Sequence, residues 1–528
     1  ARESIELTEL ALAGPTLLDG RPPAWILHNG YHSWDESGLL PLGGKTAAGA
    51  PQRRWSWWTV GLADEAGAGL AAAGSTALSS GIRFQHTDGE LFLAWCESDG
   101  LERHPTVRRC EAGAVWRTDA VRICAGDDVR AQLAGLVGGA ARDPAPQGWL
   151  SWYHYGAWVS EEDVLRNAGW VAGPAQSRLG YRFVQIDDGW QQAYGDWVAN
   201  SKFPGGMASL SAQLAAQGQR TGVWTAPFLV SASADLAAQA PEDWFLTDPA
   251  TGERAVDPRH VVFGPMYVLD ARNPAVVDHL RETHRRLHES GVTYFKIDFL
   301  YAGAHAGTAA LRAGVAAIRE GVGDSYILAC GAPLLPLVGL VNGCRVGQDI
   351  ATPVYDFEAG QPKPSIFGDE LQWVARNVAA RSSLAGWFQL DPDAALVGGN
   401  LSLEQGRQLV SLAALSGGPF FATDDLTALP ADRLALLTNP EILELIGSGA
   451  AVPDWEPLPG DGAPTIWRLR DVVGLFNWSD AGREVGLALP GRARLRDLWQ
   501  RRDLGELDPA AALLVPAHGV RLVRLATG

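Results

Sequence analysis

The sequence predicts a central (β/α)8 TIM barrel flanked by an N-terminal and a C-terminal β-sandwich. The first observation is that strand-like and helix-like segments alternate over roughly 280 residues in the middle of the chain, as in a parallel barrel. The second is the strand-like texture of the sequence on both sides of this region. The third is length, because 528 residues exceed what one hydrophobic core normally organises. We expect domains at residues 1–145, 146–438 and 439–528.

The N-terminal region is rich in glycine and tryptophan and contains short alternating apolar runs. Residues 91–96 and 114–123 have the composition that strands favour, and no helix-length periodic segment precedes Asp128. We therefore expect an all-β sandwich here. The stretch 143–148, which contains two prolines and a glycine, is the expected linker to the barrel.

The central region contains eight strand candidates, with helical patterns between most of them. Ser160 and Asp163 form a capping-box-like helix start, and Asn273 followed by Pro274 is typical of a helix N-terminus. Gly291 ends that helix just before the next strand. A doubly wound open sheet is the alternative, but no Gly-rich phosphate-binding motif follows a strand. The strand candidates are residues 148–155, 181–187, 220–228, 292–298, 325–330, 344–347, 386–390 and 418–422.

The C-terminal region returns to strand-like patterns from about residue 439. Residues 465–469, 472–478 and 519–525 alternate between apolar and polar positions or are strongly apolar. These segments predict a small C-terminal β-sandwich.

Charge and cysteine content narrow the partners and the compartment of the chain. A formal net charge of −17 disfavours nucleic acid and anionic membranes as partners, and no long uncharged apolar run predicts a membrane span. Five scattered cysteines without a CxxC pair argue against a disulfide framework or a structural zinc site. With no apolar leader at the start of the sequence, this usage predicts a cytoplasmic protein.

The segment 292–298 is the most informative strand candidate. Side chains alternate along a strand, so Tyr294, Lys296 and Asp298 share one face. Two charged groups near the end of an apolar strand are costly unless they are paired or used in chemistry. A structural ion pair between Lys296 and Asp298 is one interpretation, and a functional site is the other.

Catalytic groups of a (β/α)8 barrel come from the C-terminal ends of its strands, and acidic residues gather at these positions here. Carboxylates accept hydrogen bonds from hydroxyls, and indoles pack on the apolar face of a pyranose, so this rim suits a sugar. Asp188 could instead cap a helix, and Cys330 and Cys344 could be inert core thiols. The rim residues are Asp187, Asp188, Trp190, Trp197, Trp224, Lys296, Asp298, Cys330, Arg345, Asp349, Asp424 and Asp425.

A rim of carboxylates could also hold a divalent metal ion. Barrel metalloenzymes usually add histidine ligands, and the chain contains no HxH motif. His284 and His288 have HxxxH spacing, but His284 lies on the apolar stripe of a helix expected outside the barrel. We interpret it as a boundary histidine, and we expect neither a metal ion nor another cofactor.

Six ordered motifs of the chain resemble those of glycoside hydrolase family 36, the microbial α-galactosidases. The resemblance extends over nearly the whole chain, and the family's N-terminal β-sandwich, central barrel and C-terminal β-domain match the three predicted regions. The sequence departs from the family at Leu150, where the family usually has Cys, and at Gln348, where it usually has Pro. The motifs are Gly-Trp-Leu-Ser-Trp-Tyr-His-Tyr (148–155), Gln-Ile-Asp-Asp-Gly-Trp (185–190), Gly-Val-Trp-Thr-Ala-Pro-Phe (222–228), Tyr-Phe-Lys-Ile-Asp-Phe-Leu (294–300), Cys-Gly-Ala-Pro-Leu-Leu-Pro (330–336) and Arg-Val-Gly-Gln-Asp (345–349).

The resemblance implies a role for each of the matching residues. It implies that Asp298 is the catalytic nucleophile and that Asp349 is the general acid/base. It also implies a substrate pocket with a tryptophan lent by the N-terminal domain. The implied substrate-binding residues are Asp187, Asp188, Trp224, Lys296, Cys330, Arg345, Trp152 in the pocket wall and Trp34 from the N-terminal domain.

The implied activity is exo-acting hydrolysis of terminal α-D-galactosyl groups of melibiose- and raffinose-type oligosaccharides, with retention of configuration. Two displacements require carboxyl groups roughly 5–5.5 Å apart. Asp349 must hold a proton near neutral pH, which burial and the charge of Asp298 favour, and Lys296 should help to keep Asp298 ionised. Arg345 shares a strand face with Asp349, so we expect it to point at substrate or at another carboxylate.

Other functions stay open on the same scaffold. A galactosyl transglycosylase of the raffinose synthase type would use a sugar as the acceptor, and an α-N-acetylgalactosaminidase would need space for an acetamido group near Cys330. A non-catalytic sugar-binding protein and a metal-dependent barrel enzyme belong to different classes, and the intact Asp298 and Asp349 argue against the first of these. The resemblance implies a small oligosaccharide as partner, and it is compatible with a monomer or a homo-oligomer.

Overall fold

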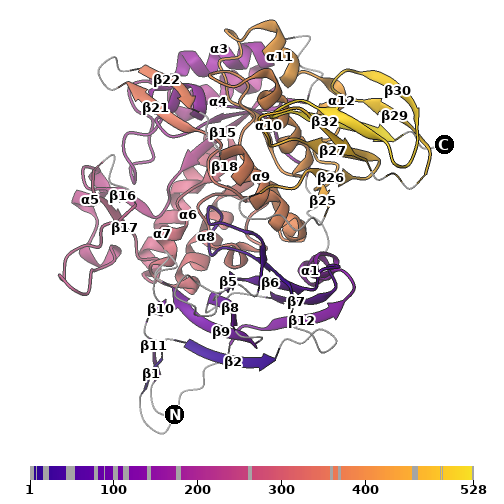
Figure 1. Cartoon of the computed structure of the whole chain (residues 1–528). Coiled ribbons are helices and arrows are strands. Elements are labelled where there is room, and N and C mark those ends of the chain that lie inside the picture. The colour runs from indigo at the N-terminus through magenta and orange to yellow at the C-terminus, as the bar shows by residue number, and fades with distance from the viewer. Residues whose placement is uncertain are drawn as a thin grey trace.

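The computed structural model of the chain contains a parallel β-barrel between two all-β regions, which is the predicted fold class (Figure 1). The N-terminal strands lie at the bottom of Figure 1, the barrel in the middle and the C-terminal strands at the upper right. The structure describes residues 5–7, 9–15, 23–42, 54–75, 81–87, 90–98, 105–106, 108–110, 118–138, 144–173, 180–259, 264–356, 361–366, 370–454, 462–487, 489 and 491–525.

The barrel is a sheet of eight parallel strands in the order β23-β20-β19-β18-β15-β14-β13-β24. The ring closes just beyond β23, where the N–H of Ala395 donates to the carbonyl of Phe421 at 2.7 Å and Ala395 pairs with Ala422 of β24. Each predicted strand segment overlaps one of these strands, and the alternative of an open sheet is wrong. The strands are β13 (Gln147–Leu150), β14 (Phe183–Ile186), β15 (Arg220–Thr225), β18 (Val292–Ile297), β19 (Tyr326–Ala329), β20 (Gly343–Arg345), β23 (Gln389–Asp391) and β24 (Phe420–Ala422).

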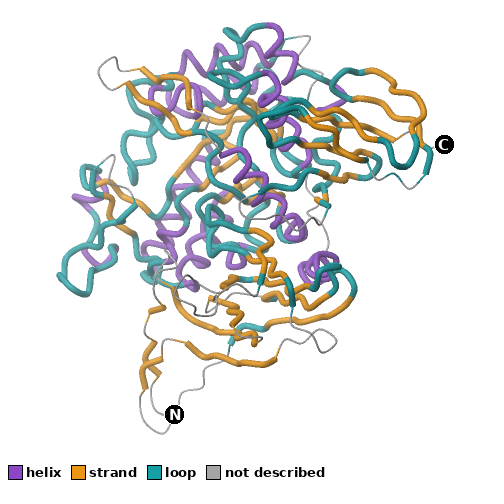
Figure 2. Tube along the Cα trace, in the orientation of Figure 1, coloured by secondary structure: helices purple, strands orange, loops and turns teal. Residues whose placement is uncertain are grey.

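Helices lie around the outside of the barrel, as the purple segments of Figure 2 show. The predicted capping box is present, because the Ser160 hydroxyl accepts from the N–H of Asp163 and the Asp163 carboxylate accepts from the N–H of Ser160. Asn273 caps the predicted helix that begins at Pro274. The barrel helices are α3 (Glu161–Val171), α4 (Gly206–Ala216), α6 (Pro274–Glu289), α8 (Thr308–Val322), α9 (Glu370–Arg381), α10 (Leu403–Leu415) and α11 (Ala431–Leu437).

Two strands end three or more residues earlier than predicted. Residues 152–155 form the short helix α2 (Trp152–Tyr155), because the N–H of Tyr155 donates back to the carbonyl of Ser151 at 3.1 Å. β15 ends at Thr225 rather than Phe228, since the chain turns at residues 226–229 and proline at 227 has no N–H for the sheet. Both segments leave the barrel at the C-terminal end of a strand.

The N-terminal region contains two five-stranded antiparallel sheets and one helix, α1 (Val129–Val137). Strand β9 contains the predicted segment 91–96; of the predicted segment 114–123, residues 114–117 lie outside the described part and 121–123 begin β12. One sheet comprises β12 (Val121–Gly126), β7 (Gly69–Gly74), β6 (Thr59–Ala63), β3 (Trp25–His28) and β4 (Gly38–Pro41); the other comprises β10 (Pro105–Thr106), β9 (Glu90–Ser98), β8 (Gly81–Thr87), β5 (Arg54–Trp57) and β2 (Glu9–Pro15), and β1 (Ile5–Leu7) pairs separately with β11 (Arg108–Cys110).

The C-terminal region contains a six-stranded and a two-stranded antiparallel sheet around a second apolar core. The three segments predicted there form β26, β27 and β32. The larger sheet comprises β25 (Val452–Pro453), β26 (Ile466–Leu469), β27 (Val472–Phe476), β32 (Val520–Leu525), β29 (Ala493–Asp497) and β30 (Arg502–Leu507), and the smaller one comprises β28 (Arg483–Gly486) and β31 (Ala512–Val515).

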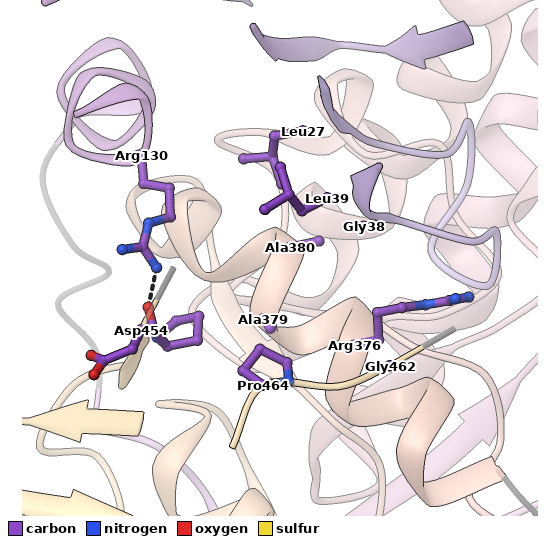
Figure 3. Close-up of a pocket in the computed structure, with 11 residues that line it drawn as sticks. Leu27, Gly38, Leu39, Arg130, Arg376, Ala379, Ala380, Asp454, Gly462 and Pro464 are labelled. Atoms are coloured by element: carbon purple, nitrogen blue, oxygen red, sulfur yellow. Dashed lines mark hydrogen bonds between the residues drawn. The ribbon is translucent and has the colours of Figure 1, made fainter. Parts of the chain in front are cut away.

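All three regions meet at a cavity (Figure 3). Its walls include Leu39 from the N-terminal region, Ala379 from α9 and Pro464 from the C-terminal region. The guanidinium of Arg130 in α1 donates to the carbonyl of Pro453, which ties the two outer regions together. The domain boundaries at residues 145 and 438 stay predictions.

Two antiparallel strand pairs lie beyond barrel strands. After β15, strands β16 (Leu229–Ser231) and β17 (Met266–Val268) pair with each other, and after β20, strands β21 (Thr352–Asp356) and β22 (Gln361–Ile366) do so. The second pair lies close to α2. Within the described residues, no helix combines the length and the apolar character needed to cross a membrane.

Candidate active site

The C-terminal ends of the barrel strands bring the predicted site residues to one rim. Asp187 directly follows β14, Asp298 follows β18, Cys330 follows β19, and Arg345 ends β20. Because all eight strands are parallel, these positions lie at the same end of the barrel. The prediction that charged groups gather at this rim is therefore confirmed.

Asp298 is held by two N–H donors. Its Oδ2 accepts from the indole N–H of Trp224 at 3.0 Å, and its Oδ1 accepts from the backbone N–H of Phe299 at 2.7 Å. Phe299 has a φ of 52°, which turns the chain sharply after the strand. The carboxylate is thereby fixed in direction while only 6% of the residue is exposed. Two N–H donors stabilise a negative charge in such a site.

Lys296 pairs with Asp187 rather than with Asp298. Its Nζ donates to Asp187 Oδ2 at 2.9 Å, and both side chains are buried. Burial is the largest single influence and lowers the pKa of Lys296, but the nearby acidic groups, with Asp187 the strongest, together outweigh it, and the net pKa is raised. The structural ion pair between Lys296 and Asp298 that the sequence allowed is wrong, because the ammonium reaches past β15 to Asp187 at the end of β14. The charge of Asp298 still contributes to the raised pKa of Lys296.

Asp188 is buried next to Asp187. It accepts from Gln191 Nε2 at 2.6 Å and from the hydroxyl of Tyr194 at 2.7 Å. Burial raises the pKa of Asp188 to about 6, although these two donors oppose the rise. The alternative that Asp188 caps a helix is wrong, because its carboxylate binds side chains and the next described helix begins at Gly206. Tyr194 also contacts the ring of Trp224, with ring centroids 5.2 Å apart, so aromatic side chains line this part of the rim.

Arg345 donates hydrogen bonds to three carboxylates. Its Nη1 donates to Asp349 Oδ1 at 2.9 Å, its Nη2 to Asp393 Oδ1 at 2.8 Å and its Nε to Asp391 Oδ2 at 3.2 Å. The expected contact with another carboxylate is confirmed. The contact with Asp349 itself was not expected, and it arises because a guanidinium presents donors in several directions and one of them faces the loop after β20.

Sequence reasoning missed Asp391 and Asp393. They stand in Leu390-Asp391-Pro392-Asp393 at the C-terminal end of β23, so the rule that selected the other rim carboxylates also applies to them. It also missed Tyr153, whose hydroxyl donates to Asp393 Oδ2. No simple motif identifies Tyr153, because its partner lies 240 positions away along the chain.

Asp349 lies four positions beyond the end of β20, and 51% of its side chain is exposed. The expectation that burial helps it to hold a proton is therefore wrong for this structure. The residue stands in the loop at the barrel mouth, where one side of the carboxylate faces Arg345. Its neighbour Gln348, which differs from the resembled family, is partly buried.

Trp34 reaches the rim from the N-terminal region, as predicted. Its ring packs against Phe299 and Tyr301, with centroid distances of 5.5 and 6.0 Å. Buried Arg381 holds the loop that carries Trp34 by donating to the carbonyls of His32, Ser33 and Asp35. Trp152 stands half-buried at the start of α2.

Asp424 and Cys344 are structural. Asp424 accepts from the backbone N–H groups of Val397 and Gly398 at 2.9 and 2.8 Å, so it fastens a loop. Cys344 is buried in the core, as one interpretation proposed. Cys330 is also buried, and burial followed by the charge of Asp298 raises the pKa of its thiol. Leu150 lines a small cavity together with Lys296, Arg345 and Asp393.

His284 and His288 do not converge. His284 contacts the carbonyl of Leu280 at 2.8 Å and the hydroxyl of Thr225 at 3.2 Å, and burial lowers its pKa to about 4. This confirms that it is a boundary histidine between α6 and the barrel. Among the described residues, no group of three or more His, Cys, Asp or Glu side chains is placed to hold a metal ion.

Two family models match the chain. The one described as Melibiase matches residues 171–316, which contain β14, β15 and β18. The one described as "Alpha galactosidase C-terminal beta sandwich domain" matches residues 466–525. The two matches therefore cover one half of the rim and the C-terminal sheet.

Individual proteins extend these matches. An α-galactosidase of Cyamopsis tetragonoloba is 31% identical over 406 residues, which cover 71% of this chain and 85% of that protein. The structure of an α-galactosidase from Thermus thermophilus in complex with p-nitrophenyl α-D-galactopyranoside is 27% identical, with a TM-score of 0.64, and the match covers 83% of this chain and 89% of that one. The GH36 α-galactosidase AgaA from Geobacillus stearothermophilus shares the fold at 15% identity, with a TM-score of 0.68 over 99% of this chain and 78% of that one.

Proposed function

This chain belongs to the α-galactosidase family of glycoside hydrolases and is an exo-acting α-galactosidase, and we propose that it acts by a retaining double displacement. The observation that carries the proposal is the contrast between two carboxylates at the barrel rim. Asp298 is buried and fixed by two N–H donors, whereas Asp349 is half exposed. The first environment suits a nucleophile and the second suits a group that exchanges protons with water.

In the first step, ionised Asp298 attacks the anomeric carbon of the galactosyl group. The bond to the leaving oxygen breaks as Asp349 donates its proton to that oxygen. The product is a covalent glycosyl-enzyme with inverted configuration. A bound sugar would cover Asp349 and reduce its contact with water.

In the second step, Asp349 accepts a proton from water. The water oxygen attacks the anomeric carbon, and the bond to Asp298 breaks. Two inversions together retain the α-configuration of the released galactose. Asp298 returns to its ionised form, and Asp349 is protonated again for the next cycle.

We also propose that the buried charged groups hold the galactosyl hydroxyls. Asp187 and Asp188 provide acceptor oxygens, and Lys296 and Arg345 provide donors. Trp224, Trp152, Trp34 and Cys330 complete the pocket in this proposal. The position of Lys296 supports it, because its ammonium binds Asp187 and is close enough to Asp298 to be affected by the charge of the proposed nucleophile.

Within the family, we propose membership in glycoside hydrolase family 36. Two features support this assignment: the contact of Trp34 with Phe299 next to the nucleophile, and the shared fold with AgaA over 99% of the chain. Melibiose- and raffinose-type oligosaccharides are the proposed substrates. The p-nitrophenyl galactoside and stachyose complexes of the Thermus thermophilus enzyme support this choice of sugar class.

The test is hydrolysis of p-nitrophenyl α-D-galactopyranoside followed by NMR of the freshly released sugar. We expect α-galactose first, with β-galactose appearing only by mutarotation. Initial β-galactose would contradict the double displacement. The same experiment with melibiose and raffinose tests the substrates, and a longer oligosaccharide product would instead indicate transglycosylation.

We propose that the protein works in the cytoplasm. The cysteines at positions 96, 124, 330 and 344 are free thiols, and three of them are buried. A reducing compartment keeps such thiols intact. Fractionation of the source cells with an activity assay tests this, and activity confined to the extracellular or periplasmic fraction would contradict it.

A further inference from the structure

Asp393 occupies a central position in the acid/base half of the site. Its two carboxylate oxygens accept from the Arg345 guanidinium at 2.8 Å, the N–H of Ala394 at 2.7 Å, the N–H of Ile350 at 3.1 Å and the Tyr153 hydroxyl. Only 4% of the residue is exposed. A carboxylate with this many donors is built to stay ionised and fixed in place.

The backbone of Asp393 points to a built geometry as well. Its φ of 85° is uncommon for a residue with a side chain, and such conformations persist where the surrounding contacts determine them. The backbone N–H of Asp393 donates to Asp391 Oδ1 at 3.0 Å. The carboxylate of Asp391 therefore holds the backbone of Asp393 next to Arg345.

Two contacts connect Asp393 to Asp349. One runs through the backbone, because Ile350 immediately follows Asp349 and its N–H is bound by Asp393. The other is electrostatic, because the guanidinium of Arg345 forms ion pairs with Asp391, Asp393 and Asp349. The guanidinium that binds Asp349 is therefore also held in place by two buried carboxylates.

We propose that Asp393, supported by Tyr153, is a positioning residue for proton transfer by Asp349. It fixes the peptide that follows Asp349 and holds Arg345 in place, so that the carboxyl group of Asp349 is directed at the leaving oxygen. This inference rests on the proposed acid/base role of Asp349. Burial raises the pKa of Asp393 to about 6 against the effect of Arg345, so its carboxylate is ionised at neutral pH, where the proposal needs the charge.

The test compares two substrates with the same sugar and different leaving groups. Departure of p-nitrophenolate needs little protonation, whereas departure of methanol from methyl α-D-galactopyranoside needs it fully. In Asp393→Asn we expect kcat/KM to fall about 10²-fold for the methyl galactoside and less than about tenfold for the aryl galactoside.

Asp424→Asn is the matched control. Asp424 is also a buried carboxylate near the barrel rim, and burial likewise raises its pKa to about 6, but it accepts from the backbone N–H groups of Val397 and Gly398 instead of from Arg345. This variant should affect both substrates equally. If Asp393→Asn behaves in the same way as this control, Asp393 is only structural and the proposal is overturned.

Tyr153→Phe is a second test of the role of Asp393. It removes the phenol donor but keeps the contacts of Asp393 with Arg345 and Ile350. We expect the same dependence on the leaving group, reduced to several-fold. If Asp393→Asn does not fold, equal losses on both substrates in Tyr153→Phe overturn the proposal.

Asp349→Ala separates this inference from the function on which it rests. If Asp349→Ala shows no dependence on the leaving group, the acid/base role itself is wrong. If Asp349→Ala shows that dependence and Asp393→Asn does not, the acid/base role stands and only the role of Asp393 fails.

Discussion

The two halves of the barrel rim are built differently. Around β14, β15 and β18, Asp298 is buried and receives one indole and one backbone N–H, while Lys296 pairs with Asp187 next to it. Around β20 and β23, Asp349 is half exposed and shares the cation of Arg345 with two further carboxylates. The first half holds the carboxylate of Asp298 in one place. In the second half, the carboxylate of Asp349 faces water and shares its cation with two buried carboxylates.

This difference matches the two tasks of a double displacement. A nucleophile has to stand at one place and one angle, and fixed N–H donors supply that without a proton to exchange. An acid/base has to donate a proton to an oxygen and take one from water within each cycle, so its surroundings must be able to support both charge states. The predictions below test the comparison, beginning with the largest expected effect.

Asp298→Asn should remove activity most completely. An amide cannot form the glycosyl-enzyme, so we expect kcat for the aryl galactoside to fall about 10⁴-fold or more. Added azide should restore turnover and give β-galactosyl azide, because a single displacement inverts the anomeric centre. Circular dichroism checks that the fold survives, and a variant that folds and retains the wild-type rate would contradict the assignment of Asp298.

Asp349→Ala should distinguish the two halves of the rim, because its effect should depend on the leaving group. We expect losses of about 10²–10⁴-fold with poor leaving groups and much smaller losses with p-nitrophenolate. Azide should give α-galactosyl azide here, because Asp298 is intact and both displacements take place. NMR of the azide product distinguishes the two variants, and β-azide from Asp349→Ala would mean that the two roles are exchanged.

Lys296→Met should destabilise the fold as well as the site. It leaves Asp187 buried without its ammonium, which typically costs about 3–5 kcal/mol in the free energy of unfolding. The double variant with Asp187→Asn should recover part of this loss. Urea unfolding of the two single variants and the double variant measures the coupling, and simple additivity would contradict a buried pair.

Galactose affinity should depend on pH through Asp188. Its raised pKa of about 6 means that the carboxylate is ionised above that pH and protonated below it. If the ionised form accepts from a sugar hydroxyl, affinity is complete above about pH 6 and falls as the pH drops through it. Calorimetric titration of galactose at several pH values tests this, and Asp188→Asn serves as the control that should lose this pH dependence. A flat profile in the unmodified protein would remove Asp188 from the sugar site.

Much of the architecture could be predicted from local patterns. All eight barrel strands, the capping box at Ser160 and the helix start at Pro274 depend on neighbours within a few positions, so periodicity and capping residues identify them. The strand ends were less accurate, because the chain leaves the barrel at α2 and at the turn after Thr225. Those departures follow from contacts at the rim rather than from the strand pattern.

The sequence alone placed Asp187, Lys296, Asp298 and Arg345 at one rim, because parallel strands bring their C-terminal ends together. It did not determine which charges meet there. Lys296 forms an ion pair with Asp187 and not with Asp298, which shares its strand face. Arg345 forms ion pairs with Asp349, Asp391 and Asp393. Only the tertiary structure decides such pairings, because an ion pair depends on the distance and burial of side chains from different strands, which the order of residues along one strand does not contain.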